Sequence, residues 1–180
     1  MSRKQLTMNQ TFHHVEPKSL TENPFSMLDD AWMLITAGDM EKHNTMTASW
    51  GGVGVIWNKP VATIYVRPQR YTYEFTEKNE YFTLSVFAEE YRKTLTYCGR
   101  NSGRDVDKDK ECGLTPFLAK DDIAGSVAYQ EARLVFVCKK LYAQDLVPES
   151  FIDPTLAEKN YPSNDFHRMY IGEIVAVLEK

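Results

Sequence analysis

The order of strand-like segments along the chain restricts the possible folds more than any other feature. Short runs rich in β-branched and aromatic residues recur with few helical segments between them, at residues 32–38, 46–49, 61–66, 81–87, 133–138 and 167–178. Two helices are expected among them, at residues 71–78 and 88–99. A doubly wound parallel sheet needs a helix between successive strands, so this order predicts a mainly β (α+β) chain built on a closed or sandwiched antiparallel sheet.

The segments between these elements have their own patterns. Residues 51–54, Gly-Gly-Val-Gly, predict a turn or a close approach of two backbones. Residues 100–113 predict a loop or a short turn of helix, and residues 148–162 a surface excursion that carries turns. Residues 1–26 are polar and broken by prolines, so we expect an extended N-terminal arm ahead of a single domain at residues 27–180.

Composition narrows the class of protein. The chain has 180 residues, of which 43% are hydrophobic and 26% charged, as in soluble globular proteins. The net charge of −4, without a long basic run, argues against binding to nucleic acid or to an anionic membrane. No apolar run approaches the roughly 20 residues of a membrane span, and the N-terminus lacks the apolar core of a secretion signal, so we expect a cytoplasmic protein.

Three cysteines, Cys98, Cys112 and Cys138, are widely spaced and form no CxxC pair. This spacing indicates neither a zinc site nor a disulfide framework, so we expect buried or idle thiols and no metal. Among the histidines, His13, His14 and His43 are expected at the surface.

Residues 44–50 concentrate side chains that suit a flat heteroaromatic ligand. They are Asn44, Thr45, Met46, Thr47, Ala48, Ser49 and Trp50. On a strand, alternate residues share one face, and such a ligand needs small residues for approach, a Met or aromatic wall, and polar groups at its edge. The same stretch also fits an ordinary Thr-rich strand with a packed tryptophan.

A second group of residues, Arg67, Arg70, Tyr71 and Thr72, follows a strand and a proline at the expected start of a helix. Backbone N–H groups at a helix start, together with arginine and a hydroxyl, suit a phosphate. Solvated arginines near a helix start are the alternative.

Two later positions complete the candidate set. Ser102 begins a Ser-Gly-Arg sequence that can form a nest of backbone donors, and Lys108 follows within reach of an anion or a carbonyl edge. His167 stands at the start of the last strand, where it can donate to a cofactor or a substrate. A charged loop and a structural histidine are the corresponding alternatives.

Common catalytic signatures are missing from the sequence. It contains no HExxH, no GxxxxGK[ST] and no GxGxxG after a strand, and no Ser-His-Asp order. Hydrolase, nucleotide-triphosphate and Rossmann dinucleotide functions therefore gain no specific support.

Taken together and in this order, the four groups resemble the flavin reductase-like family of FMN-binding split barrels, which includes flavoredoxins. The resemblance rests on Asn44-Thr-Met-Thr-Ala-Ser-Trp50, Arg67-Pro-Gln-Arg-Tyr-Thr72, Ser102-Gly-Arg-Asp-Val-Asp-Lys108 and His167-Arg-Met-Tyr-Ile-Gly-Glu-Ile174. It implies a six-stranded antiparallel Greek-key split barrel with a few short helices. It also implies a homodimer with FMN near the subunit interface.

The resemblance also implies roles for individual residues. The isoalloxazine ring would be surrounded by Asn44, Trp50, Thr72, Lys108 and His167. Backbone and hydroxyl contacts to the flavin would come from Thr47, Ala48 and Ser49, and the phosphate end would be held by Arg70 and Tyr71, with Thr45, Met46, Arg67 and Ser102 completing the set. Lys108 and His167 would face the redox-active side as the catalytic residues.

Three functions remain open on these grounds. In the first, NAD(P)H passes hydride from nicotinamide C4 to flavin N5, Lys108 stabilises negative charge on the flavin, and His167 is a positioning donor. In the second, the chain is an FMN electron carrier that accepts electrons from a redox protein such as a ferredoxin. In the third, it is a non-catalytic module for another planar ligand such as haem. Residues 148–165 match no family pattern, and no residue matches a nicotinamide site.

Overall fold

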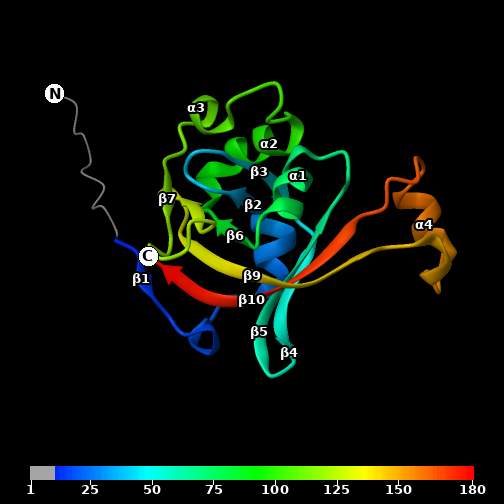
Figure 1. The fold of residues 1–180 in the computed structure, drawn as a ribbon, viewed down its shortest axis with the longest axis horizontal. Coiled ribbons are helices and arrows are strands. Elements are labelled where there is room, and N and C mark those ends of the chain that lie inside the picture. Colours follow the sequence, from blue (N-terminus) through cyan, green and yellow to red (C-terminus); the bar gives the residue numbers. More distant parts are fainter. Residues whose placement is uncertain (1–10) are drawn as a thin grey trace.

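The computed structural model describes residues 11–180, so the expected arm at residues 1–26 lies partly outside the described residues (Figure 1). The helices are short: η1 (Pro17–Ser19), η2 (Ser26–Ala31), α1 (Tyr71–Lys78), η3 (Glu89–Tyr91), α2 (Arg92–Arg100), α3 (Lys108–Cys112), η4 (Pro148–Ser150) and α4 (Pro154–Asn160). Within residues 11–180, no helix is long and apolar enough to cross a membrane.

Strands make up the body of the molecule. They are β1 (His13–His14), β2 (Met33–Gly38), β3 (His43–Ala48), β4 (Gly51–Ile56), β5 (Lys59–Val66), β6 (Tyr81–Val86), β7 (Pro116–Leu118), β8 (Val127–Tyr129), β9 (Leu134–Asp145) and β10 (Arg168–Glu179). The main sheet has the order β3-β2-β6-β9-β10-β5-β4, with β1 added on β10, while β7 and β8 form a separate pair. Every neighbouring pair is antiparallel, which confirms the mainly β, antiparallel fold predicted from the sequence.

The sheet curls until its two ends lie close together. β3 and β4 stand at opposite ends of the strand order, yet only Ser49 and Trp50 separate them along the chain. Three Cα–Cα steps reach about 11 Å at most, so the two edges approach each other at this point. The result is a barrel with an open seam, and Ser49–Trp50 crosses the seam.

Alternating side chains fill the two faces of the curled sheet. In register across β6 and β9, Leu84 and Phe136 are fully buried in the inner core. Val135 and Val137 point the other way and pack with Leu95 of α2 in a second buried cluster. The unbroken apolar run of β9 thus serves both faces, because α2 and the β7–β8 pair cover the outer one.

The glycine-rich segment 51–54 is a strand, so the expectation of a turn there was wrong. β4 pairs with β5 along its whole length, and the turn between them lies at Trp57 and Asn58, which have φ of 53° and 56°. Positive φ at two successive residues is typical of a two-residue hairpin turn. The alternative expectation, a close backbone approach, holds at Gly51, where an added Cβ would lie 2.7 Å from the Thr63 carbonyl oxygen.

Residues 146–167 form an excursion between the long strands β9 and β10, which carry it away from the body (Figure 1). The expected surface excursion is confirmed, and it contains α4 in addition to turns. Arg67 fastens the excursion to the body, because its guanidinium pairs with Asp165 and donates to the Asn160 carbonyl at 3.0 Å.

The cysteines are free thiols. Cys98 and Cys138 are buried as expected, and Cys112 is partly buried, with its Sγ 3.9 Å from that of Cys98. Burial raises the pKa of Cys98 to about 12, so this thiol stays protonated at neutral pH.

Candidate functional site

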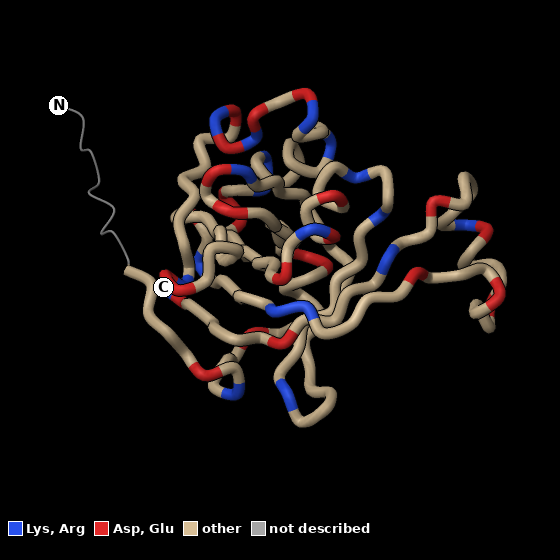
Figure 2. Tube along the Cα trace, viewed as in Figure 1, with Lys and Arg blue, Asp and Glu red and all other residues tan. Residues whose placement is uncertain are grey.

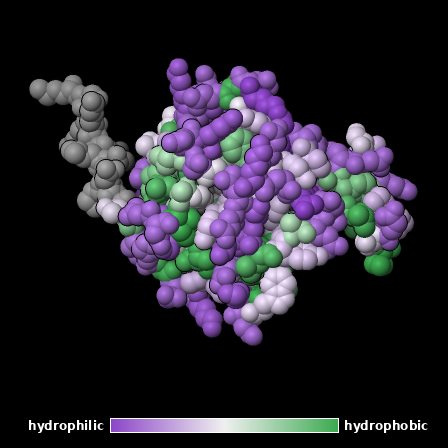
Figure 3. Space-filling view, in the orientation of Figure 1, coloured by the Kyte–Doolittle hydropathy of each residue, from purple (hydrophilic) through white to green (hydrophobic). Residues whose placement is uncertain are grey.

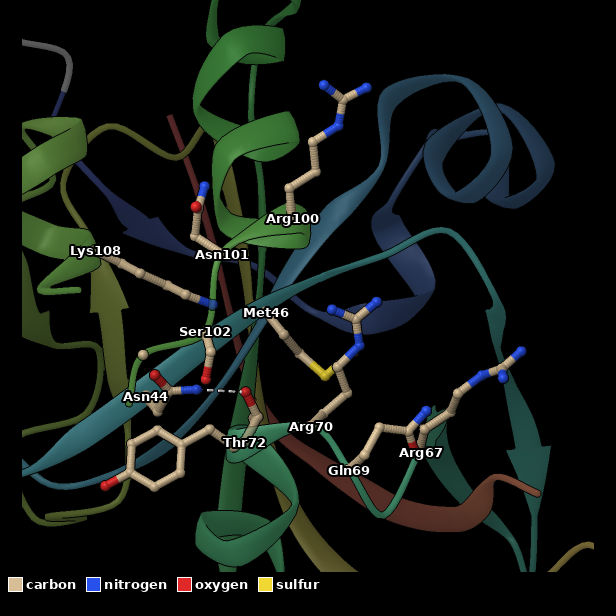
Figure 4. A pocket seen from close by; sticks show the side chains of 12 residues that line it. Asn44, Met46, Arg67, Gln69, Arg70, Thr72, Arg100, Asn101, Ser102 and Lys108 are labelled. Atoms are coloured by element: carbon tan, nitrogen blue, oxygen red, sulfur yellow. Dashed lines mark hydrogen bonds between the residues drawn. The ribbon is translucent and has the colours of Figure 1, made fainter. Parts of the chain in front are cut away.

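A cavity of about 350 Å³ lies where β3, α1, α2 and α3 meet (Figure 4). It is lined by Asn44, Met46, Arg67, Gln69, Arg70, Tyr71, Thr72, Arg100, Asn101, Ser102, Gly103 and Lys108. Three of the four sequence groups thus meet at one place: the 44–50 strand, the 67–72 turn and the 102–108 loop.

The start of α1 forms one wall of this cavity. Arg70 occupies the position before the helix, and no side chain caps the N–H groups of the first turn. Phe75, one turn further along α1, is buried in the inner core and fixes the helix against the sheet. Because uncapped N–H groups at a helix start attract anions, this wall suits a phosphate.

Asn44 and Thr72 form the polar floor. The Asn44 amide donates to the Thr72 hydroxyl at 2.7 Å, and the two side chains are almost completely buried (Figure 4). Gly103 passes directly over them, and a Cβ at this position would overlap the Asn44 Oδ1 atom. The glycine of the Ser-Gly-Arg sequence is therefore required for close approach of the loop to β3.

Lys108 extends from α3 toward the middle of the cavity (Figure 4). Its ammonium donates to the carbonyl oxygens of Thr45 at 2.7 Å and of Cys98 at 2.8 Å, and only 7% of the residue is exposed. Burial lowers the pKa of Lys108 below its ordinary value. An ammonium has three N–H donors, so one remains for a ligand.

The charge lining the cavity has one sign. Arg70, Arg100 and Lys108 contribute cations, Arg67 is paired with Asp165 outside the lining, and no Asp or Glu is among the lining residues. Arg70 is aimed by a 2.7 Å bond from its guanidinium to the Gly99 carbonyl, which leaves most of its donors free. Elsewhere along the described chain the two signs are interspersed (Figure 2). This local excess suits an anionic ligand.

Trp50 and His167 lie apart from that cavity, beside a more apolar hollow of about 560 Å³ that Tyr65 and Tyr161 help to line. The His167 and Trp50 rings are 5.3 Å apart, and the His167 Nδ1 atom lies 2.8 Å from the Tyr161 hydroxyl. Burial, with Arg67 nearby, lowers the pKa of His167 to about 4. The imidazole is therefore neutral at pH 7, which suits a positioning donor and not a proton-transfer group.

The other side chains of the 44–50 stretch make contacts away from the cavity. Thr45 donates to the Ile35 carbonyl at 3.2 Å, and the Thr47 hydroxyl donates to the Leu95 carbonyl. Ala48 belongs to the inner core, and Ser49 lines the apolar hollow. For Thr45, Thr47 and Ala48, only the backbone is left for contact with a ligand.

Some lining residues were assigned no role from the sequence. They are Gln69, Arg100, Asn101 and Gly103. The pattern contained a signal for Gly103, which lies inside the Ser-Gly-Arg nest. Arg100 and Asn101 follow the expected end of a helix, and only the tertiary fold brings them to the cavity.

Comparison with known proteins supports one family. The model of the flavin reductase like domain matches residues 27–180. No curated protein sequence matches the chain. Among solved structures, the flavoredoxin of Methanosarcina acetivorans is 23% identical with a TM-score of 0.64, covering 83% of this chain and 68% of that one.

Two further structures share the fold. An FMN-binding domain of a flavin reductases-like enzyme from Shewanella baltica is 18% identical with a TM-score of 0.68, covering 96% of this chain and 78% of that one. The NADH:FAD oxidoreductase of Streptomyces globisporus is 15% identical with a TM-score of 0.60, covering 83% and 74%. These likenesses confirm the split-barrel fold, and the matched residues, which include the whole candidate site, show that the chain belongs to the flavin reductase-like domain family.

Proposed function

We propose that this chain is an FMN-binding oxidoreductase of the flavin reductase type that uses NAD(P)H as its reductant. The observation that carries the proposal is the cavity of about 350 Å³ inside a flavin reductase-like domain: its lining holds four cations, one of them paired with Asp165, and no carboxylate. FMN combines a dianionic phosphate with a flat polar ring, and the cavity has groups for both.

The phosphate end has two matching features. The uncapped first turn of α1 offers backbone N–H groups, and Arg70 offers free guanidinium donors next to them. Tyr71 and Thr72, which belong to the same turn, line the cavity. We assign these residues to the ribityl phosphate, as the family resemblance implies.

The ring end is assigned to the polar floor and to Lys108. The Asn44 amide is fixed by Thr72, and the Lys108 ammonium is fixed by two carbonyls, so both groups are oriented before a ligand arrives. Bound FMN would supply the hydride chemistry. The charge of Lys108 would stabilise negative charge at the ring edge, and the neutral His167 would position a ligand beside Trp50.

Support for a nicotinamide reductant comes from a solved relative that is an NADH:FAD oxidoreductase. The test is to measure NADH and NADPH oxidation with FMN or FAD as acceptor. Turnover with either nucleotide is expected. FMN retained through dialysis without turnover would exclude the reductase and favour an electron carrier of the flavoredoxin type. Colourless protein that gains no flavin signal when FMN is added would exclude both the reductase and the electron carrier.

The cavity assignment has its own test. Arg70→Gln removes a cation from the cavity, and Lys93→Gln removes an exposed cation on α2 outside it. Because a charge-assisted bond to phosphate contributes about 1.5–3 kcal/mol, Arg70→Gln should weaken FMN binding by roughly 10- to 100-fold. Lys93→Gln should leave the affinity unchanged. Equal affinities of both variants and the wild type would exclude Arg70 from the phosphate site.

We also propose a homodimer. Apolar residues stand exposed around the hollow and on the excursion: Phe25 is 81%, Trp50 48% and Ile152 98% exposed. Figure 3 shows apolar surface on the excursion, at the right of the view. A second copy of the chain would cover such residues. Light scattering after size exclusion should give twice the chain mass of 20.7 kDa, and a monomer at micromolar concentration would exclude the proposal.

A further inference from the structure

Three polar side chains next to Lys108, those of His43, Asp109 and Tyr129, form a hydrogen-bonded cluster. None of them lines the cavity assigned to FMN. The Asp109 carboxylate accepts a 2.9 Å bond from the Tyr129 hydroxyl at Oδ1, and its Oδ2 lies 2.8 Å from His43 Nε2. The other imidazole nitrogen of His43, Nδ1, lies 2.9 Å from the Asp39 carbonyl oxygen. Tyr129 is fully buried, and the His43 side chain is 11% exposed, so His43 is not the surface residue expected from the sequence.

The partners of His43 determine its protonation. A backbone carbonyl and a carboxylate both accept hydrogen bonds, so both bonds form at once when each ring nitrogen carries a hydrogen, that is, when the ring is an imidazolium. Burial lowers the pKa of His43, but the hydrogen bond and the charge of Asp109 outweigh burial, and the net pKa is raised. In the protonated form, which the raised pKa favours, His43 and Asp109 are a largely buried ion pair, and Tyr129 also donates to Asp109.

This ion pair matters because α3 is too short to be stable by itself. The helix has five residues, and its local support is an N-cap bond from Asp107 and a left-handed Gly113 at its end. Helices of this length do not persist without tertiary contacts. Asp109 supplies such contacts through His43 and Tyr129. Lys108 is the residue before it, and its ammonium reaches the carbonyls of Thr45 and Cys98 only while α3 stays in place.

We propose that Asp109 is the positioning residue for Lys108: held by His43 and Tyr129, it fixes α3 on the sheet so that the Lys108 ammonium stays in the cavity. The effect on flavin rests on the proposed function, because Lys108 lines the cavity assigned to FMN. The effect on the position of the Lys108 amine is independent of the proposed function.

The arrangement predicts a dependence on pH. A histidine with a raised pKa keeps its ion pair below its ordinary pKa and loses it as the pH rises through the folded value. Other charged or titratable groups also surround His43, from the turn before β3, the 104–109 segment and β8: Asp39, Glu41, Lys42, Arg104, Asp105, Asp107, Lys108, Asp109 and Tyr129. The pKa of Lys108 is itself lowered, so the titration of His43 has to be distinguished from that of Lys108 by a variant.

Asp109→Asn distinguishes the two titrations, because it removes the ion pair of His43 and leaves Lys108 unchanged. Its amide can still accept from Tyr129, and it can donate to the Nε2 atom of a neutral His43, so both bonds persist without the ion pair. Asp109→Ala removes both bonds. Asp105→Asn is the matched control: Asp105 is exposed in the same loop, its carboxylate has no hydrogen-bond partner among the described contacts, and its charge is not among the causes that raise the pKa of His43.

The experiment is amine-specific labelling of the whole protein at pH 7 and pH 9, read by mass spectrometry as the labelling rate of Lys108 relative to exposed Lys93. In Asp109→Ala, Lys108 should label at least about tenfold faster than in the wild type, since hydrogen bonds to charged groups are lost. Asp105→Asn should match the wild type. The wild-type ratio should rise with pH by more than that of Asp109→Asn, which lacks the titrating ion pair.

Flavin binding gives the second reading. At pH 7, FMN affinity should fall about tenfold in Asp109→Ala and stay unchanged in Asp105→Asn. Protection of Lys108 in Asp109→Ala equal to that in the wild type would overturn the proposal, and so would identical pH profiles of wild type and Asp109→Asn. If the wild type binds no flavin, the proposed function fails, while the labelling result still decides the role of Asp109.

Discussion

A methyl group added at Gly103 should damage the cavity through a single contact. Built on the backbone, the new Cβ overlaps Asn44 Oδ1 and lies 2.9 Å from Asn44 Cγ and 3.3 Å from Tyr71 Cδ1. Asn44 then has to rotate away from Thr72, which breaks the 2.7 Å bond between two nearly buried side chains. A buried polar group left without a partner costs about 1–3 kcal/mol, so we expect Gly103→Ala to lower the free energy of unfolding by that amount.

The matched control is Gly52→Ala in β4, where an added Cβ has no neighbour within 4 Å. Urea unfolding of both variants, followed by tryptophan fluorescence with and without FMN, measures the two effects. Gly52→Ala should stay within about 0.5 kcal/mol of the wild type or gain stability. Gly103→Ala should be less stable than the wild type, and its affinity for FMN should be lower by about tenfold or more. A Gly103→Ala protein indistinguishable from Gly52→Ala would show that the floor of the cavity is not held as described.

Three further predictions concern the core, the floor and the response to acid. Phe136→Ala should cost about 3–5 kcal/mol of unfolding free energy in urea titrations, because Phe136 is 1% exposed in the inner core. Thr72→Val should weaken FMN binding and lower the free energy of unfolding by about 1–3 kcal/mol, since it keeps the shape but leaves the Asn44 amide without its acceptor; flavin affinity equal to that of the wild type would contradict this. The bond to Arg133 lowers the pKa of Glu22, so this stabilisation is present above the ordinary pKa of 4.5 and is lost as the pH falls through the lower folded value. The gap in unfolding midpoint between wild type and Glu22→Gln should therefore be larger at pH 7 than at pH 3.

The sequence predicted the sheet well because its signal is local. Leu84 belongs to a segment that alternates between apolar and polar residues, and Phe136 belongs to an unbroken apolar run typical of a strand buried on both faces. β4 was missed because glycine has low strand propensity, and its pairing with β5 depends on the hairpin turn at Trp57–Asn58.

The cavity was only partly predictable for a physical reason. Three groups of candidate residues meet there because α1 and α2 pack against β3, but the sequence could not place His167 and Trp50 beside a separate hollow. Nor could it pair His43 with Asp109, since 66 positions separate them and only the fold brings them together. Contacts of this kind have no local pattern.

Flavin binding underlies every functional statement above, and an FMN titration of the purified protein can measure it. The absorption spectrum is recorded before and after FMN is added, and FMN fluorescence is followed to saturation. We expect a perturbed flavin spectrum and a saturable change with one FMN per chain, weakened in Arg70→Gln and preserved in Lys93→Gln. An FMN spectrum and fluorescence that stay those of free FMN at every protein concentration would contradict the flavin assignment.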